Sequence, residues 1–272
     1  MNQICFIGSG NMAEAMIGGI LHAGLFKKDD ILASDVSRER LSCLHLKWEI
    51  KTTLNKKEDI GSSDIIVLSV KPQKIRDVMD ELSSCFKPGA LIISILAGVR
   101  LEKIEEHLPK NPPHPIARVM PNMNAMVRKS VSAVCYNSCV TGETRQMVEK
   151  ILSTIGHVHL CEEEQMDAVT AVSGSGPAYL FYFLEIFTEA ARELGFSEKE
   201  SSEFCMETCL GAMELLDKSR LLPAQLREKV TSKSGTTEAA LSYLQEKDFR
   251  KIFIEAVKAA HRRAEELGKS SS

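Results

Sequence analysis

Three short stretches of this chain combine glycine with hydroxyl-bearing residues in the way that ligand-binding turns do. The first is SKSGTT at residues 232–237, directly before an expected helix over 238–244. Unpaired N–H groups at the start of a helix, together with hydroxyls and Gly235, can hold a carboxylate. Ser234 by itself is better explained as a plain helix cap. The stretch as a whole predicts a small anion pocket.

The second stretch is VSGSGPAY at residues 172–179, which precedes the most apolar helical segment of the chain. Small residues let a backbone approach a flat ligand closely, and Pro177 suits the first turn of a helix. The same residues would also serve a tight junction between two helices. Both interpretations stay open on the sequence alone.

A third stretch, GSGNMA at residues 8–13, follows an apolar strand over 4–7 and opens an expected helix over 11–23. This is the G-x-G-x-x-A form of the dinucleotide fingerprint. Gly8 permits a tight turn, Gly10 lets the backbone approach a pyrophosphate, and Ala13 keeps the helix close to the sheet. The N–H groups and dipole at the helix start favour phosphate. The order of strand, motif and helix predicts a site for NAD or NADP.

Recognition of the adenosine ribose falls to residues at the end of the second expected strand. Asp35 is placed like the acid that accepts from the ribose hydroxyls of NAD. Ser37, Arg38 and Arg40 follow at once and could instead bind the 2′-phosphate of NADP. A helix cap for residues 37–47 is an alternative role for Asp35. The preference between NADH and NADPH stays open.

The sequence Val70-Lys71-Pro72 ends an expected strand over 64–70, at the sheet edge where open α/β proteins bind ligands. Pro72 fixes the turn there, and Lys71 could bring a positive charge near a nicotinamide. For Lys71 alone, a solvated surface lysine is an equally good explanation.

These motifs need a scaffold, and residues 1–163 alternate short β-rich runs with helical patterns. Strands are expected over 3–7, 30–34, 64–70, 90–95, 116–120, 131–136 and 157–160. Helices are expected over 11–23, 37–47, 73–85, 101–107 and 142–154. This alternation implies βαβ units and a parallel sheet with helices on both faces. We therefore predict an α/β protein with an N-terminal Rossmann-type doubly wound sheet.

Beyond residue 163 the pattern is helical, with breaks at 195–197, 223, 232–235 and 247–248. We predict a dinucleotide-binding Rossmann domain over 1–163 and an all-helical dimerisation and substrate domain over 164–272. Residues 179–187 are apolar on nearly every side, so their helix must be buried on every side. A helical domain this small cannot bury it alone, which predicts a homo-oligomer through this half.

Bulk properties exclude several functional classes. The net charge of −3 argues against a nucleic-acid partner, because neutralising several phosphates requires a basic surplus or patch. No apolar run approaches the roughly 18 residues of a membrane span. The N-terminus lacks the basic region and cleavage site of a secretory signal. We therefore expect a cytoplasmic protein with no nucleic-acid or membrane partner.

A metal site is not expected either. The eight cysteines include no CxxC pair, and in a long cytosolic chain buried free thiols are the default. His157, His159 and Cys161 alternate and would share one face of a strand. Three neighbours along a straight strand seldom converge on one ion.

Six motifs together resemble those of pyrroline-5-carboxylate reductases. They are FIGxGNMAEAMxGG from residue 6, VKP from 70, AGV from 97, RxMPN from 118, VSGSGPAY from 172 and SxxGTT from 232. The resemblance extends from Ile4 to about Gly268. It implies a Rossmann domain followed by a helical dimerisation domain. The implied reaction is hydride transfer from NADH or NADPH to the C=N carbon of 1-pyrroline-5-carboxylate, giving L-proline.

The resemblance also implies which residues bind each part of the ligands. The pyrophosphate side is formed by Gly8, Gly10, Asn11, Met12 and Ala13. Ser34, Asp35 and Asn55 are expected at the adenosine ribose, and Arg38 is placed to bind a 2′-phosphate on it. The nicotinamide side is formed by Val70, Lys71, Pro72 and Ala97. The substrate is expected at Ser175, Gly176, Ser232, Gly235, Thr236 and Thr237.

Thr237, Ser232 and Lys71 are the expected catalytic residues. Thr237 would hydrogen-bond the ring nitrogen as that nitrogen gains its proton. A threonine hydroxyl is a poor acid, which leaves a protonated imine or a relayed water as the alternative donor.

Two departures from the family pattern bear on the site. Lys233 and Ser234 stand where the family usually has proline and glycine, which would reshape the turn if position 234 needs φ > 0. Met123 and Asn124 replace the last two residues of the usual MPNTP loop. These departures motivate one alternative, a catalytically silent paralogue that binds cofactor. A β-hydroxyacid dehydrogenase is less favoured, because residues 179–194 lack the lysine that those enzymes carry on the interdomain helix.

Overall fold

The computed structural model of the chain describes residues 3–54 and 56–270, with side chains as far as residue 268. Its contacts divide the chain into two compact units. The sheet unit comprises Met1–Ser175 with Ala260–Ser272, and the helical unit comprises Gly176–Ala259. The predicted boundary after residue 163 follows a different criterion, since it marks where strands give way to helices. By contacts, residues 164–175 and the end of the last helix belong with the sheet.

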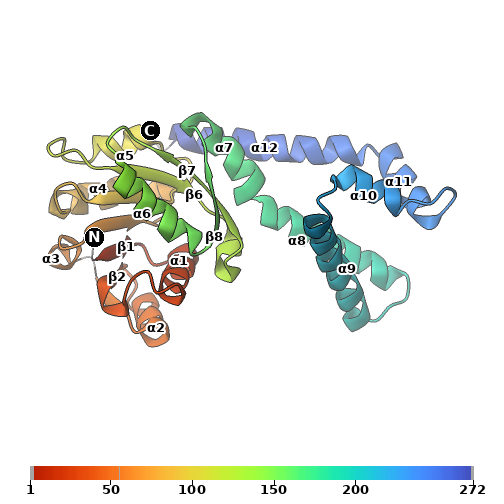
Figure 1. Cartoon of the computed structure of the whole chain (residues 1–272), viewed down its shortest axis with the longest axis horizontal. Helices are drawn as coiled ribbons and strands as arrows, with labels where there is room; N and C mark the ends of the chain where they lie inside the picture. Colours follow the sequence, from red (N-terminus) through yellow and green to blue (C-terminus); the bar gives the residue numbers. More distant parts are fainter. Residues whose placement is uncertain (1–2, 55, 271–272) are drawn as a thin grey trace. The chain divides into compact units, whose positions relative to one another are not determined.

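The sheet unit is built on one eight-stranded sheet, seen on the left of Figure 1. The strand order is β3-β2-β1-β4-β5-β6-β7-β8, and only the pairing of β6 with β7 is antiparallel. The strands are β1 (Ile4–Ile7), β2 (Ile31–Ser34), β3 (Lys51–Thr53), β4 (Ile65–Leu68), β5 (Leu91–Ser94), β6 (Ile116–Met120), β7 (Ser130–Tyr136) and β8 (Gly156–Leu160). Because β1 pairs with both β2 and β4, the strand order reverses there, and ligands bind at such a switch point.

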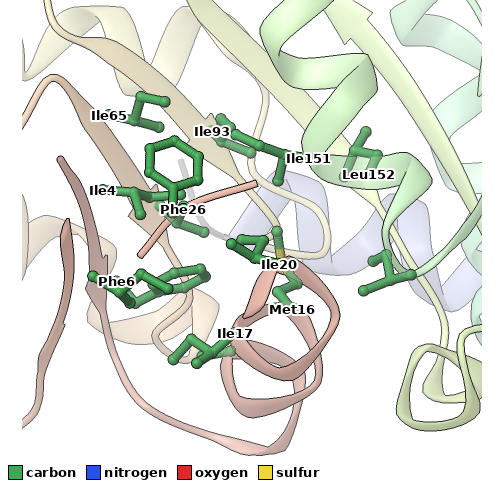
Figure 2. Packing of buried hydrophobic residues seen from close by; sticks show 14 of the residues in the cluster. Ile4, Phe6, Met16, Ile17, Ile20, Phe26, Ile65, Ile93, Ile151 and Leu152 are labelled. Atoms are coloured by element: carbon green, nitrogen blue, oxygen red, sulfur yellow. The ribbon is translucent and has the colours of Figure 1, made fainter. Parts of the chain in front are cut away.

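Helices cover both faces of this sheet, as the alternation of strands and helices predicted. They are α1 (Asn11–His22), α2 (Arg38–Trp48), α3 (Lys57–Ile60), α4 (Ile75–Leu82), α5 (Leu101–Glu106) and α6 (Gly142–Ser153). On one face, Ile4 and Phe6 of β1 pack with side chains of α1 and α6 (Figure 2). On the other face, Cys5 and Ile7 pack with side chains of α4 and α5. The doubly wound α/β fold is confirmed.

Most predicted elements agree with the structure to within two or three residues, and three differences concern the site. Strand β3 and helix α3 were not expected, because each is short and mostly polar. The strand predicted over 64–70 ends at Leu68. Val70, Lys71 and Pro72 therefore lie beyond β4 and not at its last residues. That correction leaves them at the same edge of the sheet.

After β8 the described residues contain helices and no strand. A short helix α7 (Met166–Val169) and a π-helical turn (Thr170–Gly174) belong to the sheet unit. The remaining helices are α8 (Gly176–Glu193), α9 (Glu198–Ser219), α10 (Pro223–Lys229), α11 (Thr236–Glu246) and α12 (Phe249–Ser270). The breaks fall where the sequence placed them: Gly195 has φ 99°, Pro223 starts α10, and Asp248 has φ 53°.

Helix α8 carries an exposed apolar surface within the single chain. Leu180, Phe181 and Tyr182 keep 63%, 59% and 64% of their surface exposed. Exposed apolar area of this extent on one helix is typical of a surface that associates with another protein. Among the described residues, no helix combines the length and apolar character that a membrane span needs.

Candidate functional site

The turn that follows β1 depends on glycine at position 8. Gly8 has φ 90°, and a Cβ atom there would lie 2.7 Å from the carbonyl carbon and oxygen of Ser69. The Ser69 hydroxyl donates to the Gly8 carbonyl at 2.6 Å, and the Ser69 N–H donates to Ile7 O at 2.8 Å. Only glycine lets the turn lie this close to the residue that follows β4.

Gly10 has a different environment and leaves open space above the turn. Its φ of −69° suits any residue, and a Cβ atom there would have no neighbour within 4 Å. Gly10 is the N-cap of α1, and no side chain caps this helix. Next to this open space, Asn11 is exposed and Met12 half-buried at the start of α1, where unpaired N–H groups favour phosphate, whereas Ala13 is buried against the sheet. The residues present fit the diphosphate of a dinucleotide.

Asp35 joins the end of β2 to this turn. One carboxylate oxygen accepts from the Ser9 N–H at 2.8 Å, and the other accepts from the Ser37 N–H at 2.9 Å. The N-cap of α2 is Ser37, whose hydroxyl accepts from the Arg40 N–H. Asp35 is therefore not the cap of that helix, and the alternative role considered for it is wrong. The carbonyl of the buried Ser34 accepts from the Gly8 N–H at 2.8 Å.

Arg38 is exposed at the first position of α2. Its guanidinium group forms no hydrogen bond or ion pair with any residue that the structure describes. Asn55, the other residue expected near the adenosine, lies outside the described residues.

The residues expected on the nicotinamide side gather at the carboxyl ends of two neighbouring strands. Val70, Lys71 and Pro72 follow β4, and Ala97 follows β5. Because β4 pairs with both β1 and β5, these residues share one sheet edge with Gly8. The Lys71 side chain is exposed there. The structure therefore brings the diphosphate turn and the predicted nicotinamide side to the same edge.

The RxMPN and VSGSGPAY motifs meet in the sheet unit. The side-chain amide of Asn122 donates to the carbonyl and the hydroxyl of Ser173, each at 3.2 Å. A Cβ atom on Gly174 would lie 2.7 Å from Met120 Cε. These contacts pack the segment tightly against Met120 of β6 and the Asn122 loop, and not against a second helix as one of the two sequence-based roles had it. Its backbone is π-helical, a deviation often found at functional sites.

Ser175 and Gly176 stand at the end of this junction. The Ser175 N–H and hydroxyl both donate to the Thr170 carbonyl, at 2.9 and 3.1 Å. Gly176 begins α8, and a Cβ atom on it would have no neighbour within 4 Å. The hydroxyl oxygen of Ser175 retains lone pairs that can accept from a ligand.

The SKSGTT turn lies in the helical unit and ends at the start of α11. Its N-cap is Gly235, with no capping side chain, so the expectation that Ser234 caps this helix is wrong. The hydroxyls of Ser232, Thr236 and Thr237 have no hydrogen-bond partner in the part of the chain that is described. Free hydroxyls beside an uncapped helix start can bind a carboxylate.

Ser234 occupies the position where the family usually has glycine, and its φ is 59°. Its N–H donates to the Glu238 carboxylate at 2.6 Å. Position 234 therefore has the positive φ that would explain why the family usually has glycine there. A serine there is strained relative to glycine.

We expect Ser234→Gly to raise the free energy of unfolding by about 1 kcal/mol, because the strain at positive φ is removed. Urea unfolding followed by circular dichroism measures the change. The matched control is Ser42→Gly in the middle of α2, which is expected to lower stability by about 1 kcal/mol. Destabilisation by Ser234→Gly would contradict the assigned backbone conformation.

Several residues that shape the site had no role assigned from the sequence. Ser69 stands directly before the VKP motif, and Asn122 ends RxMPN, so their proximity to motifs was a usable signal. Glu238 is the acid four residues after Ser234 in the first turn of α11. Among the described residues, no group of three His, Cys, Asp or Glu side chains is arranged to hold a metal ion.

Comparisons with known proteins cover both parts of the chain. Residues 163–267 match the family described as pyrroline-5-carboxylate reductase dimerisation. Residues 3–98 match the family described as NADP oxidoreductase coenzyme F420-dependent. The pyrroline-5-carboxylate reductase of Pseudomonas aeruginosa is 38% identical over 97% of this chain and 96% of its own. That of Synechocystis sp. is 35% identical over 98% of both chains.

Solved structures give the same result. A pyrroline-5-carboxylate reductase from Coxiella burnetii has a TM-score of 0.87 at 34% identity, covering 98% of each chain. A pyrroline carboxylate reductase from Plasmodium falciparum, solved with NADP bound, has a TM-score of 0.89 at 28% identity, also covering 98% of each chain. These matches extend over almost the whole chain. They therefore include the sheet, the turn at residues 8–13 and the SKSGTT turn at residues 232–237. The chain belongs to the pyrroline-5-carboxylate reductase family.

Proposed function

We propose that this chain reduces the C=N bond of 1-pyrroline-5-carboxylate to give L-proline, using NADH or NADPH. The observation that carries the proposal is the set of unbonded hydroxyls around Gly235, at the uncapped start of α11. A cyclic imino acid offers a carboxylate and a ring nitrogen to such a turn. The family membership adds the expectation that the sheet unit holds the nicotinamide cofactor.

Binding and orientation of the substrate belong to the SKSGTT turn. The Thr236 and Thr237 N–H groups and the Ser232 hydroxyl donate to the substrate carboxylate. The Thr237 hydroxyl hydrogen-bonds the ring nitrogen, and so it holds the imine in one orientation. The family resemblance adds Ser175, whose hydroxyl oxygen can accept a hydrogen bond, and Gly176, which has open space beside its backbone, as further expected substrate residues.

Binding of the cofactor belongs to the sheet unit. Asn11 and Met12 bind the diphosphate beside Gly10, while Gly8 and Ala13 form the tight turn and the close packing that hold them in place. Asp35 meets the adenosine ribose, and the free guanidinium of Arg38 is available to a 2′-phosphate. Ser34 has no exposed surface and acts from below, through its carbonyl bond to the Gly8 N–H. The cofactor, when bound, supplies the hydride for the imine carbon.

The nicotinamide side of the cofactor site is formed by Val70, Pro72 and Ala97 with Lys71. The exposed ammonium of Lys71 adds positive charge at this edge of the sheet. A protonated ring nitrogen makes the imine carbon more electrophilic. A threonine hydroxyl is a weak acid and a poor proton donor by itself. The Thr237 hydroxyl oxygen therefore accepts a hydrogen bond from the protonated ring nitrogen and so stabilises and orients the imine.

We also propose that the active form is a homo-oligomer in the cytoplasm. The exposed Leu180, Phe181 and Tyr182 of α8 are the surface that a second copy would cover. Residues 163–267 match a family named for dimerisation, which supports this assembly. Sedimentation velocity at micromolar concentration is expected to show no stable monomer. A stable monomer would contradict the proposed assembly.

The activity is tested by following the absorbance of NADH and of NADPH with pyrroline-5-carboxylate present and absent. We expect oxidation that depends on the imine and produces an equal amount of proline. The faster of the two cofactors then gives the preference. No oxidation with either cofactor would contradict the proposed reaction and support a silent paralogue that binds cofactor.

A further inference from the structure

One guanidinium group ties the diphosphate turn to the two helices beside it. Arg40 of α2 donates from Nε to the Ser9 carbonyl at 2.5 Å, and from Nη2 to the Gly10 carbonyl at 3.3 Å. The same Nη2 lies 2.5 Å from a carboxylate oxygen of Glu14 on α1. The Arg40 and Glu14 side chains are only 28% and 19% exposed. Charge-assisted bonds with this little water access hold their geometry well.

A second cation strengthens this arrangement. Lys47, about two turns further along the same face of α2, lies 2.7 Å from the other carboxylate oxygen of Glu14. The ammonium of Lys47 and then the guanidinium of Arg40 hold the pKa of the Glu14 carboxyl below its ordinary value. Glu14 therefore stays ionised at neutral pH and fixes the orientation of the Arg40 fork.

The direction of these bonds determines what the turn presents to a ligand. Arg40 binds the carbonyls of Ser9 and Gly10, and Asp35 binds the Ser9 N–H. With those groups held, the Ser9 carbonyl stays on the Arg40 side of the turn, and the Gly10 carbonyl is held there both by Arg40 and by the Glu14 N–H of α1 at 3.0 Å. Carbonyl oxygens that faced the diphosphate would repel it.

We infer that Arg40 is a positioning residue for the diphosphate turn and does not recognise the 2′-phosphate of NADP. This inference rests on the dinucleotide site described under the proposed function. The guanidinium of Arg40 already has three acceptors within the protein, so its contribution should be the same for NADH and NADPH. Arg38, two residues earlier, has no such partners among the described residues.

The test measures binding, not turnover, so it stays separate from a failure of the proposed reaction. Dissociation constants for NADH and for NADPH are measured by the fluorescence of the reduced nicotinamide. For Arg40→Met we expect both dissociation constants to rise roughly tenfold or more, because the charge-assisted hydrogen bonds of Arg40 are lost. The ratio between them should stay within about twofold. Arg40→Lys keeps the charge but not the fork, and should recover only part of the affinity.

Two further variants guard against misfolding and unspecific effects. Glu14→Gln keeps both helices intact, removes the charge that orients Arg40, and should raise both constants by a smaller but equal factor. Arg145→Met removes a surface guanidinium paired with Glu149 on α6, and should change neither constant. Each variant is first checked for an unchanged circular dichroism spectrum and melting temperature. If Arg40→Met does not fold, the Arg40→Lys and Glu14→Gln results decide.

A loss confined to NADPH in the Arg40 variants would overturn the inference, because it would make Arg40 a 2′-phosphate ligand. Unchanged affinity for both cofactors would overturn it as well. A lower melting temperature with unchanged dissociation constants would show a purely structural role. Equal losses in a folded protein support the positioning role.

Discussion

Replacing Gly10 by alanine is expected to leave the fold intact and to lower the affinity for the dinucleotide strongly. A methyl group at this position would have no neighbour within 4 Å in the protein, and φ is an ordinary −69°. The melting temperature should therefore stay unchanged. The same methyl group occupies the space through which a diphosphate approaches the start of α1. We expect the dissociation constants for NADH and NADPH to rise about a hundredfold, roughly 2.7 kcal/mol.

Gly8→Ala is the matched comparison and should fail for another reason. Its φ of 90° and the 2.7 Å approach to the Ser69 carbonyl leave no room for a Cβ atom. This variant should lose about 2–3 kcal/mol of folding stability, measured by urea unfolding. The two glycines of the fingerprint therefore have different expected effects: Gly10→Ala weakens cofactor binding, and Gly8→Ala lowers folding stability. Normal dinucleotide affinity in Gly10→Ala would show that the diphosphate does not bind at this turn.

The fold was largely predictable because its signals are local. Apolar four-residue strands such as β1 and β4 stand between turn residues, and all their positions are buried. Breaks between the helices carry their own cause, as at Gly195 and Pro223. Strand β3 had no such signal, because its residues are Lys, Thr and Thr and its pairing with β2 supplies the order.

The candidate site was predictable only in part, because its supporting contacts join distant residues. The motif spacing identified Gly8 and Gly10. It could not reveal that Asp35 holds the Ser9 N–H, since that bond depends on β2 lying beside β1. The link between Asn122 and Ser173 crosses 51 positions and depends on packing. Ser234 shows the opposite case, in which a departure from a family pattern correctly raised a backbone question.

Thr237→Ala is expected to lower kcat about a hundredfold while the dissociation constants for NADH and NADPH change less than about twofold. The Thr237 hydroxyl is half-buried and has no hydrogen-bond partner among the described residues, so its removal leaves no broken bond inside the protein. The loss therefore reports contact with substrate and not a disturbed fold. Steady-state kinetics with pyrroline-5-carboxylate and fluorescence titration of the cofactor measure the two quantities separately.

Two threonine variants show whether the hydroxyl or the backbone of this turn matters. Thr237→Ser keeps the hydroxyl and should retain most of the turnover. Thr231→Ala removes a hydroxyl that donates to the Arg227 carbonyl at 2.6 Å, just before the turn, and should leave kcat near normal. Wild-type turnover in Thr237→Ala would exclude Thr237 from the reaction. The first-turn N–H groups of α11 would then be the part of this turn that binds the substrate, because a side-chain substitution leaves them in place.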